Sequence, residues 1–449
     1  PLPLARLRAW GHLNELRAAD LRFTPAEVEA FLRTTMQITL TGAQATHLAE
    51  RTEGWPAGVQ LAALAHRQHT APLSTAPLNR HRFILDYLAD EVLAQQPPEL
   101  QEFLLITAIL ERMCAELCAA LLAEAQLLAG DQPSVFSPQP STLLEHLEQA
   151  NLFLIPLDHE RRWYRYHHLF ADLLRYRVQQ RFPKHIPALH RRAARWFAEA
   201  GMIDDAIRHA LAGGDAALAA DLVALEGRAR LARGELVTLR KWLDALPAEH
   251  RRARPRLLLL EAWTQFWAYQ PEPVAAALAQ VAHHAEALPP ELTAEVLALQ
   301  AFLARDRADQ PTALRLAQQA LALAGDNPWL HGVLHGNLGD MAWFAEDVTQ
   351  ALEGHRCALA YACRCNDPVQ LVDATHSLAQ FELLQGRLTA AEAAYTYGDQ
   401  LLAERGTAAH PFRELLALSR AGILYERYDL AAARAAAELG LAWGGGAAA

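Results

Sequence analysis

The stretch Thr349-Gln350-Ala351-Leu352 is one of five related segments that decide the fold of this chain. The other four are Pro273-Val274-Ala275-Ala276, Pro311-Thr312-Ala313-Leu314, Thr389-Ala390-Ala391-Glu392 and Leu430-Ala431-Ala432-Ala433. Aligned on the alanine in third place, they follow one another at steps of 38, 38, 40 and 41 residues. Each segment opens the second helix of a helix pair, and its small residue predicts that two helices approach closely. Because one pair cannot bury its apolar face alone, the pairs must stack on their neighbours.

The period exceeds the roughly 34 residues of ordinary tetratricopeptide repeats. We therefore expect residues 256–449 to form a long, tetratricopeptide-like α-solenoid (a superhelix), preceded by a helical connector over residues 186–255. Further upstream, residues 152–157 and 163–166 are short aliphatic and aromatic segments around a polar turn, with a helical pattern over 167–180. Two short strands behind a helix are typical of the wing of a winged-helix domain, which we place at residues 79–185.

A smaller helical domain is expected at residues 25–78. Thr24-Pro25-Ala26-Glu27 combines a capping box with proline at the first helical position, and a second helix start follows at Thr41. Gly54-Trp55-Pro56 predicts a turn into a third helix over residues 57–67. A residual strand is expected around residues 13–16 and 21–23. The predicted fold class is all-α, with one winged-helix hairpin and this strand.

Composition agrees with an Ala- and Leu-rich helical protein of about three domains, since 449 residues exceed one core and 52% are hydrophobic. The net charge of −10 excludes a global positive field that would draw the chain to nucleic acid. The sequence contains no uncharged apolar run of membrane-spanning length and no signal-peptide pattern at its start. It begins Pro-Leu-Pro-Leu without a methionine, which we interpret as a chain cut from a longer protein.

The metal-ligating residue types form no convincing site. Five cysteines (Cys114, Cys118, Cys357, Cys363 and Cys365) lie on helical patterns without a CxxC pair, so we expect buried or partly buried free thiols and a cytoplasmic location. His331 and His335 have the i, i+4 spacing of a helical metal pair, but no third ligand accompanies them. We therefore expect exposed helix histidines and no metal.

Four stretches resemble MalT-like regulators, the large ATP-binding members of the LuxR family. They are residues 1–24 (PLPLARLRAWGHLNELRAADLRFT), 51–64 (RTEGWPAGVQLAAL), 83–93 (FILDYLADEVL) and 164–174 (YRYHHLFADLL). Their order is that of the family, and together they cover about residues 1–255. The repeats beyond 255 are similar to the family only in kind.

The resemblance implies a signal-transduction ATPase with numerous domains (STAND protein), in which residues 1–24 end the nucleotide-binding domain and residues 25–78 are its lid. Such proteins rest as ADP-bound monomers, and they exchange to ATP and oligomerise when a sensor binds its inducer. A C-terminal LuxR-type domain then binds DNA. This chain departs from the pattern at both ends. No Gly-Lys dipeptide of a Walker A loop occurs, and the tail after Trp443 is no helix-turn-helix.

The same resemblance assigns candidate nucleotide contacts to two places. Gly54-Trp55-Pro56 matches the GxP motif of the lid, whose proline packs against adenine. His167 or His168 would be the winged-helix histidine that contacts the β-phosphate of ADP, and a helix N-terminus favours such an anion. The alternatives are a helix-breaking turn at Gly54-Trp55-Pro56 and capping or core histidines at 167 and 168.

Two basic segments are candidates for contacts with nucleic acid. Residues 161–195 are the most basic stretch and carry Trp163, Tyr164 and Tyr166, but Asp158, Glu160 and Asp172 interrupt the charge. The arginine run at residues 251–256 lies between helical blocks, where a solvated loop is the ordinary interpretation. We expect DNA contact only through a C-terminal domain that this chain lacks.

The sensor candidates lie on the first helices of the repeats. Trp263 and Trp267 share a helix face at i, i+4, and Asn337, Asp340 and Trp343 lie on the first helix of the third repeat. Aromatic rings beside amide and carboxylate groups suit a sugar or another small polar ligand. The alternative is that these rings fill the contacts between stacked helices.

These observations predict the middle portion of an inducer-responsive transcriptional activator that couples ATP or ADP binding to a repeat sensor. Its partners would be an unidentified inducer or regulatory protein, further copies of itself, and no membrane. A stand-alone repeat scaffold for protein binding is the alternative. No serine, cysteine or carboxylate constellation indicates an enzymatic site, so we expect no enzyme activity from this chain.

The missing Gly-Lys dipeptide leads to a first prediction. The chain alone should show no ATP turnover and at best weak ADP binding, because no lysine is placed to reach the outer phosphates. Phosphate release and calorimetric titration with ADP measure both quantities. Turnover that persists through repeated purification would contradict the domain assignment.

Overall fold

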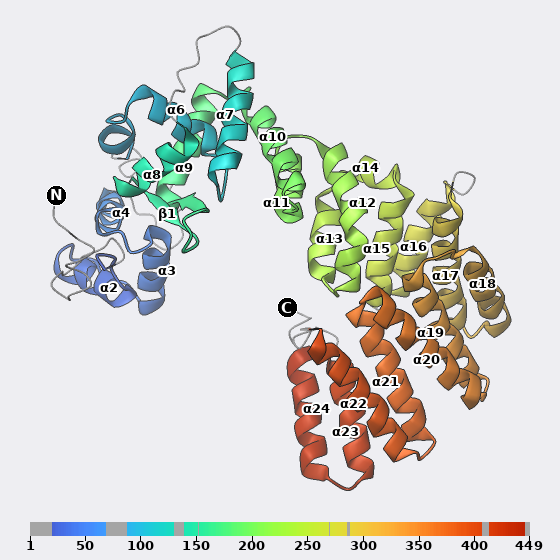
Figure 1. Cartoon of the computed structure of the whole chain (residues 1–449). Helices are drawn as coiled ribbons and strands as arrows, with labels where there is room; N and C mark the ends of the chain where they lie inside the picture. The colour runs from blue at the N-terminus through green and yellow to red at the C-terminus, as the bar shows by residue number, and fades with distance from the viewer. Residues whose placement is uncertain are drawn as a thin grey trace. The chain divides into compact units, whose positions relative to one another are not determined.

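The computed structural model describes residues 20–68, 88–129, 139–150, 152–268, 270–284, 288–405 and 413–444. By its internal contacts the chain divides into two compact units, Pro1–Gly214 and Asp215–Ala449. The described residues are almost entirely helical, with one two-stranded hairpin (Figure 1). The predicted all-α fold is therefore confirmed. The unit boundary falls inside the segment 186–255 that we predicted as a connector.

Three helices form the start of the first unit: α2 (Pro25–Thr34), α3 (Gly42–Thr52) and α4 (Pro56–Gln68). The predicted capping box is present between Thr24 and Glu27 before α2, and the predicted helix start at Thr41 has a second capping box, with Gln44, before α3. The apolar positions at helical spacing, such as Leu32 and Leu48, are fully buried. Residues 21–23 form no strand, which corrects that expectation, and residues 13–16 lie outside the described residues.

The winged-helix part follows in the same unit. Its elements are η2 (Leu88–Leu93), α6 (Pro98–Thr107), α7 (Ala115–Ala129), α8 (Pro140–Gln149), β1 (Leu154–Pro156), β2 (Tyr164–Tyr166) and α9 (His168–Arg181). The strands pair antiparallel with Leu154 opposite Tyr166, and Met113 adds a bridge to Tyr164. Phe103 and Phe170 are enclosed in the core between the helices and this hairpin. Helices α10 (Ile186–Glu199) and α11 (Ile203–Ala212) complete the unit.

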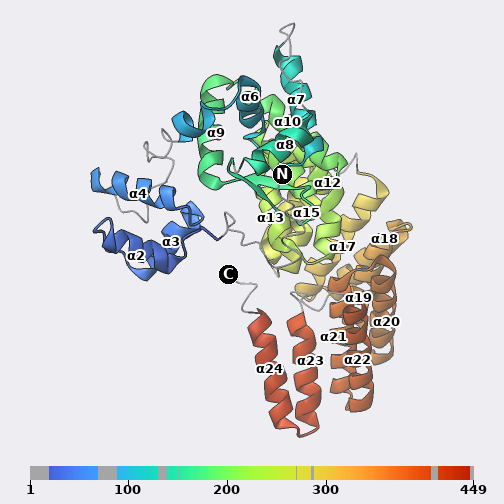
Figure 2. The ribbon, with the colours of Figure 1, turned by 60° about the vertical axis from the view of Figure 1, so that its left-hand side comes forward.

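The second unit is an array of helices that follow one another in chain order (Figure 2). They are α12 (Ala216–Ala232), α13 (Leu236–Ala245), α14 (Ala248–Arg252), α15 (Pro255–Trp267), α16 (Pro271–Ala282), α17 (Pro290–Asp306), α18 (Gln310–Leu323), α19 (Pro328–Phe344), α20 (Val348–Cys365), α21 (Pro368–Leu384), α22 (Leu388–Glu404), α23 (Arg413–Glu426) and α24 (Leu430–Gly444). From α15 onward they form the predicted pairs. Each predicted repeat segment lies at the start of a second helix.

The repeat register differs from our alignment at both ends of the array. Ala313, Ala351 and Ala391 are fully buried, each four residues after the residue that caps its helix. In α16 and α24 the buried residue at this place is Val274 or Ala433, whereas Ala275 and Ala432 are half-buried. The first and last segments were therefore aligned one residue off, because runs of small apolar residues look alike in either register.

Helices α19 and α20 approach each other through glycine. A Cβ built on Gly354 would lie 2.7 Å from the Cα of Gly339 and 2.9 Å from the carbonyl oxygen of His335. These are backbone atoms, which cannot turn aside as a flexible side chain does. In the third repeat the two helices are therefore so close that position 354 has room for the hydrogen atom of glycine but not for a methyl group.

The five cysteines are free, as predicted, with Cys114 and Cys118 buried and the other three partly buried. Across the part of the chain that the structure describes, no helix has the length and apolar character needed to cross a membrane.

The close approach gives a prediction with a matched control. Gly354→Ala should destabilise the array by about 1–3 kcal/mol, because the added methyl overlaps backbone atoms. Gly336→Ala adds the same methyl 3.8 Å from the Cβ of Ala358, where there is room. It should be neutral or stabilising by about 0.5–1 kcal/mol, since alanine favours helix. Thermal unfolding followed by far-UV circular dichroism compares them, and equal effects of the two substitutions would contradict the packing argument.

Candidate functional site

A cavity with a volume of about 460 Å³ lies within the first unit, between the helices at its start and the winged helix. Its lining comes from four separate places in the chain: Leu21 and Arg22; Glu53, Trp55, Pro56 and Ala57; Phe153 to Ile155; and His167. Two of the predicted lid residues, Trp55 and Pro56, therefore share one cavity with one of the two predicted histidines. His168 is not among the residues that line it.

Three rings form one wall of this cavity. The ring centroids of Trp55 and Phe153 are 5.1 Å apart, and that of His167 lies 6.2 Å from Trp55 and 5.8 Å from Phe153, all edge to face. Edge-to-face packing leaves ring faces and edges available to a flat apolar ligand.

Phe153 was missed by the sequence analysis, which placed it inside a strand. Its φ of 56° is in the left-handed region, which a bulky residue rarely adopts. The backbone oxygen of Phe153 accepts a hydrogen bond of 2.7 Å from the backbone N–H of His167, which holds this conformation. Such strain is retained where the surrounding structure fixes it, often at functional sites.

Gly54 is needed for a contact within the protein. Its φ is 68°, and a Cβ built there would lie 2.5 Å from the carbonyl oxygen of Phe23. The backbone N–H of Phe23 donates to the carbonyl oxygen of Gly54 at 2.8 Å. The close approach that this glycine permits is therefore to the Phe23 backbone, which positions the adjacent Leu21 and Arg22 at the cavity.

His167 is buried, and both of its ring nitrogens are engaged. Nδ1 accepts from the backbone N–H of Leu169 at 3.3 Å, so it caps α9, and Nε2 lies 3.1 Å from the carbonyl oxygen of Thr52. The proton of the neutral ring is thus on Nε2, which donates to Thr52. Burial lowers the pKa of His167, although the nearby Glu53 acts in the opposite direction. The capping alternative is correct for His167 in this conformation.

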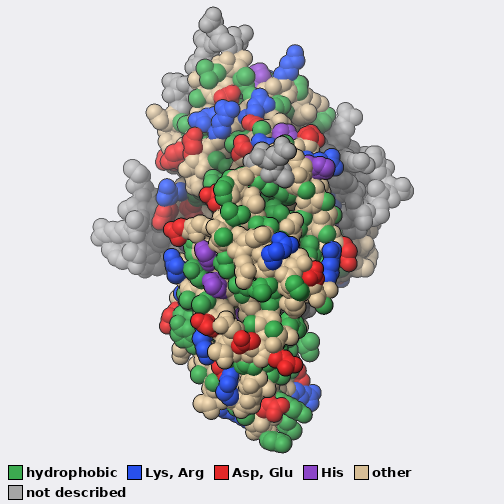
Figure 3. Space-filling model, turned by 90° about the vertical axis from the view of Figure 1, so that its right-hand side faces the viewer, with side chains coloured by type: hydrophobic (Ala, Val, Ile, Leu, Met, Phe, Trp, Pro, Cys, Tyr) green, Lys and Arg blue, Asp and Glu red, His purple; other side chains and the backbone are tan. Residues whose placement is uncertain are grey.

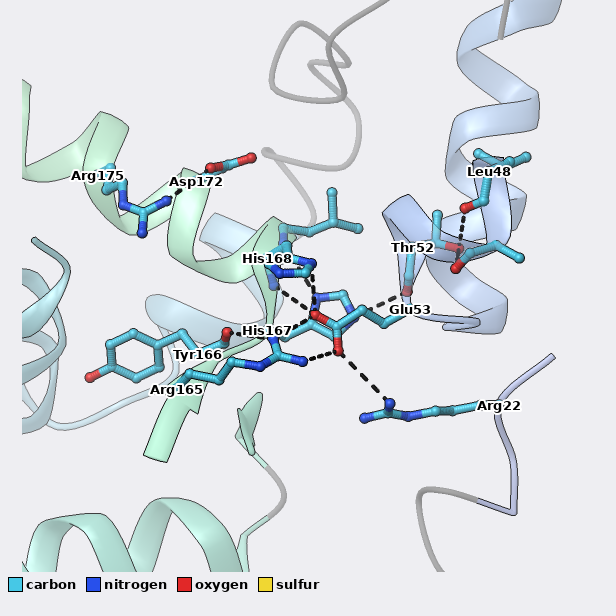
Figure 4. Close-up of polar contacts among 12 residues, drawn as sticks. Arg22, Leu48, Thr52, Glu53, Arg165, Tyr166, His167, His168, Asp172 and Arg175 are labelled. Carbon is cyan, nitrogen blue, oxygen red and sulfur yellow. Dashed lines mark hydrogen bonds and ion pairs between the residues drawn. The ribbon is translucent and has the colours of Figure 1, made fainter. Parts of the chain in front are cut away.

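Glu53, the residue that caps the end of α3, joins this helix to the winged helix (Figure 4). Arg165 donates to both of its carboxylate oxygens, at 2.7 and 3.0 Å, and Nδ1 of His168 lies 2.9 Å from the first of these oxygens. The backbone N–H of His168 also donates to it, at 3.3 Å. Arg22 adds a longer ion pair at 3.8 Å. A nearly enclosed carboxylate, 7% exposed, therefore holds three segments together.

The charge of Glu53 is stabilised in this setting. Burial by itself would raise the pKa of the carboxyl group, but the hydrogen bonds and charge of Arg165 and the N–H of His168 outweigh it. The pKa falls from 4.5 to about 2. Sequence reasoning gave no weight to Glu53, because nothing near it in the chain indicates its partner at position 165.

In the second unit the predicted sensor residues separate. Trp267, Asn337 and Asp340 line one cavity of about 190 Å³. Trp263 does not reach it, since the ring is fully buried and its Nε1 donates to Glu295 at 2.8 Å. Trp343 stacks on Phe381 with a centroid distance of 4.3 Å. The packing alternative therefore describes Trp263 and Trp343.

The basic residues of the wing are paired with acids. Arg161 lies 3.3 Å from Glu148, Arg162 contacts Glu160, and Arg165 contacts Glu53. Figure 3 shows a different face, the right-hand side of Figure 1, where Lys and Arg side chains are likewise interspersed with Asp and Glu. These features agree with solvated or paired arginines.

His331 and His335 are half-buried, which corrects the expectation of exposed side chains. Both rings stack on Tyr361, with centroid distances of 5.2 and 5.6 Å. Nε2 of His331 also lies 2.9 Å from the carbonyl oxygen of Gly325. Within the described ranges, no group of three or more His, Cys, Asp or Glu residues is placed to hold a metal ion.

Comparison with known protein families gives two matches along the chain. The MalT winged helix domain matches residues 89–186, and the MalT-like TPR region matches residues 294–448. A winged helix followed by a tetratricopeptide-repeat array is the architecture of a regulator of the signal-transduction ATPase type.

The relatives agree with these matches. The chain is 30% identical to the HTH-type transcriptional regulator MalT of Cronobacter sakazakii over 98% of its own length. It is 34% identical to the serine/threonine-protein kinase PknK of Mycobacterium tuberculosis over 62% of its length. It spans 48% of the first relative and 24% of the second. The chain belongs to the MalT-like family.

A solved structure shares the fold. It is a signal transduction ATPase with numerous domains (STAND) protein with a tetratricopeptide repeat sensor, from Pyrococcus horikoshii. The TM-score is 0.53 at 14% identity, with 94% of this chain and 60% of that chain covered.

The Glu53 contacts predict a pH-dependent stability. Because the pKa is lowered on folding, the stabilisation is complete above about 4.5 and is lost as the pH falls toward about 2. Glu53→Gln should cost about 2 kcal/mol at pH 7, and the difference should shrink as the pH falls below the unfolded-state value of 4.5.

Hydrogen exchange of α3 and α9, compared between variants at each pH, measures this difference. Glu50→Gln is the matched control, because Glu50 is exposed on the same helix. A difference between Glu53→Gln and the parent that is the same at every pH would contradict the electrostatic explanation.

Proposed function

We propose that this chain is the regulatory middle portion of an ATP-dependent, inducer-responsive transcriptional activator. In this proposal the lid and winged helix couple the state of a bound nucleotide to the repeat array, which acts as the sensor. Self-association and DNA binding would be properties of the activated full-length protein. The supporting observations are the family membership and the cavity that lid and winged helix line together.

The cavity carries the nucleotide part of the proposal. Trp55, Pro56 and Phe153 offer it an apolar, largely flat surface that fits an adenine base. Arg22 lies on the same cavity and is the cation available for a phosphate. The phosphates of a bound nucleotide would bring negative charge close to Arg22. The residues fit the base better than the phosphates, in keeping with the absence of a Walker A sequence from this chain.

Between the two histidines, the geometry favours His167 as the residue that faces nucleotide. His167 lines the cavity and holds a proton on Nε2, now donated to Thr52. Moving this donor from a backbone oxygen to a phosphate would exchange one hydrogen bond for another. His168 instead holds Glu53 and is 64% exposed on its side chain. In this proposal His168 supports the lid contact, whereas His167 senses the nucleotide.

The proposal is tested in the full-length protein. His167→Leu should raise inducer-free transcription about five- to tenfold and lower the amount of ADP that copurifies. A contact made in only one state stabilises only that state, and one hydrogen bond accounts for a shift of about this size. Reporter transcription and nucleotide content measure the two effects.

Two further variants separate the contact from general damage. His167→Gln keeps an N–H donor and should restore part of the repression, while His159→Leu removes an exposed histidine of the wing and should change nothing. If His167→Leu leaves both basal transcription and ADP content unaltered, the nucleotide role of this residue is wrong.

A further inference from the structure

The cavity of the repeat unit is built almost entirely from first helices. Its lining residues come from α15, α17, α19 and α21, and Ala358 of α20 is the one contribution from a second helix. These first helices follow one another through the array (Figure 1). Three successive repeats and the helix after them therefore contribute to one site. Its volume of about 190 Å³ accommodates several waters or one small ligand.

Asn337 presents an unsatisfied donor at this cavity. Its Oδ1 accepts from Arg305 at 2.9 Å, so the amide cannot be flipped without placing an NH₂ group against a guanidinium. The Nδ2 atom is buried and has no hydrogen-bond partner among the described residues, and the residue is 1% exposed. An unpaired donor of this kind costs about 1–3 kcal/mol.

Gln370 presents an unsatisfied acceptor. Its Nε2 donates to the carbonyl oxygen of Trp329 at 3.0 Å and to Asp367 at 3.2 Å, which fixes the amide orientation. Its Oε1 then has no partner within the described part of the chain, and the residue is 4% exposed. Gly332, which also lines the cavity, leaves room for this oxygen, since a Cβ there would lie 2.1 Å from it.

Asp373 adds a carboxylate to the same lining. No hydrogen bond or ion pair holds it in the described structure, whereas the other carboxylate of the cavity, Asp340, contacts both Arg305 and His355. Burial and the charge of Asp340 raise the pKa of Asp373 to about 6, against the opposite effects of His355 and Arg305. Asp373 is therefore ionised at neutral pH without a cation to balance it.

The remaining charges argue against an anionic ligand. Arg305 is the one cation among the lining residues, and it is held by Asn337, by Asp340 at 2.6 Å and by Asp306 at 3.2 Å. Among the described residues, the charge that remains without an ion pair in this cavity is the negative charge of Asp373. Trp267, Phe266 and Phe302 form an aromatic wall beside it, and aromatic faces attract cations.

From this arrangement we infer that the repeat cavity binds a small cationic amine that also carries a neutral hydrogen-bond acceptor, such as a hydroxyl or an amide carbonyl. The ammonium group of the ligand pairs with the carboxylate of Asp373 and donates a hydrogen bond to Oε1 of Gln370. The ligand's neutral acceptor receives a hydrogen bond from Nδ2 of Asn337. Aliphatic carbons of the ligand pack on the aromatic wall. This inference rests on the proposed sensor role of the array and names the chemical class of its ligand.

The test uses ligand-observed NMR on the 449-residue chain with matched pairs of probes: ethanolamine against ethylene glycol, and glucosamine against glucose. We expect the amines to bind with a Kd on the order of 1 mM, as ligands of this size do, and the neutral partners at least about tenfold more weakly. Asp373→Asn should weaken amine binding at least about tenfold, because a charge-assisted contact is lost.

The same substitution has a second expected effect that separates binding from folding. Asp373→Asn should keep or raise the melting temperature, since it removes an unbalanced charge from a partly buried position. Asp326→Asn, on an exposed loop of the same unit, is the matched control and should leave both quantities unchanged.

Three outcomes would overturn the inference: no amine binds, the neutral probes bind as well as the amines, or Asp373→Asn binds amines as the parent does. These outcomes concern the ligand class alone. The proposed regulatory function fails separately, if the nucleotide cavity variants leave transcription and ADP content unchanged in the full-length protein.

Discussion

The buried carboxylate of Glu53 is the constraint on which the first unit depends. Taking this charge out of water is costly, and the cost is offset only while Arg165 and the amide and ring of His168 remain in place. Those partners lie on β2 and at the start of α9, so the end of α3 can keep this charge compensated only in one position against the winged helix. The cavity lined by Trp55, Pro56 and His167 exists because that position is held.

In the repeat unit, polar side chains are buried between the helix pairs, and these side chains need partners there. Trp263 and Glu295 are enclosed together, and the carboxylate of Glu295 is paired with Arg228. Asp340 is compensated by Arg305 on one side and His355 on the other. Several buried side-chain atoms of this unit still lack a partner among the described residues, and two of them, Nδ2 of Asn337 and Oε1 of Gln370, belong to residues that line one cavity. Native proteins retain few such atoms, and a ligand gives them a partner.

Local signals made much of the fold predictable, and distant partners limited what could be said of the sites. The capping boxes at Thr24 and Thr41 depend on residues three positions away, and the hairpin at residues 154–166 on a short polar turn. The family resemblance directed attention to Pro56 and His167, which share a cavity. The role of Glu53 had no local signal, because its partner Arg165 lies far away in the chain. The left-handed backbone of Phe153 had none either, because it is held across the hairpin by the N–H of His167. Trp263 and Trp267 are equivalent by helical spacing, yet only the second lines the repeat cavity, since the neighbouring helix encloses the first.

Asp340 also limits how far the array can be treated as a set of modules. Its carboxylate is shared between Arg305 of the preceding repeat and His355 of its own second helix. Exchanging this repeat for another, or replacing it with a consensus unit, would remove the common partner of Arg305 and the buried ring of His355. Neighbouring repeats are thus matched to each other by charge as well as by shape. An engineer who wished to graft this array onto another protein would have to move the repeats that contain Arg305, Asp340 and His355 as a single block.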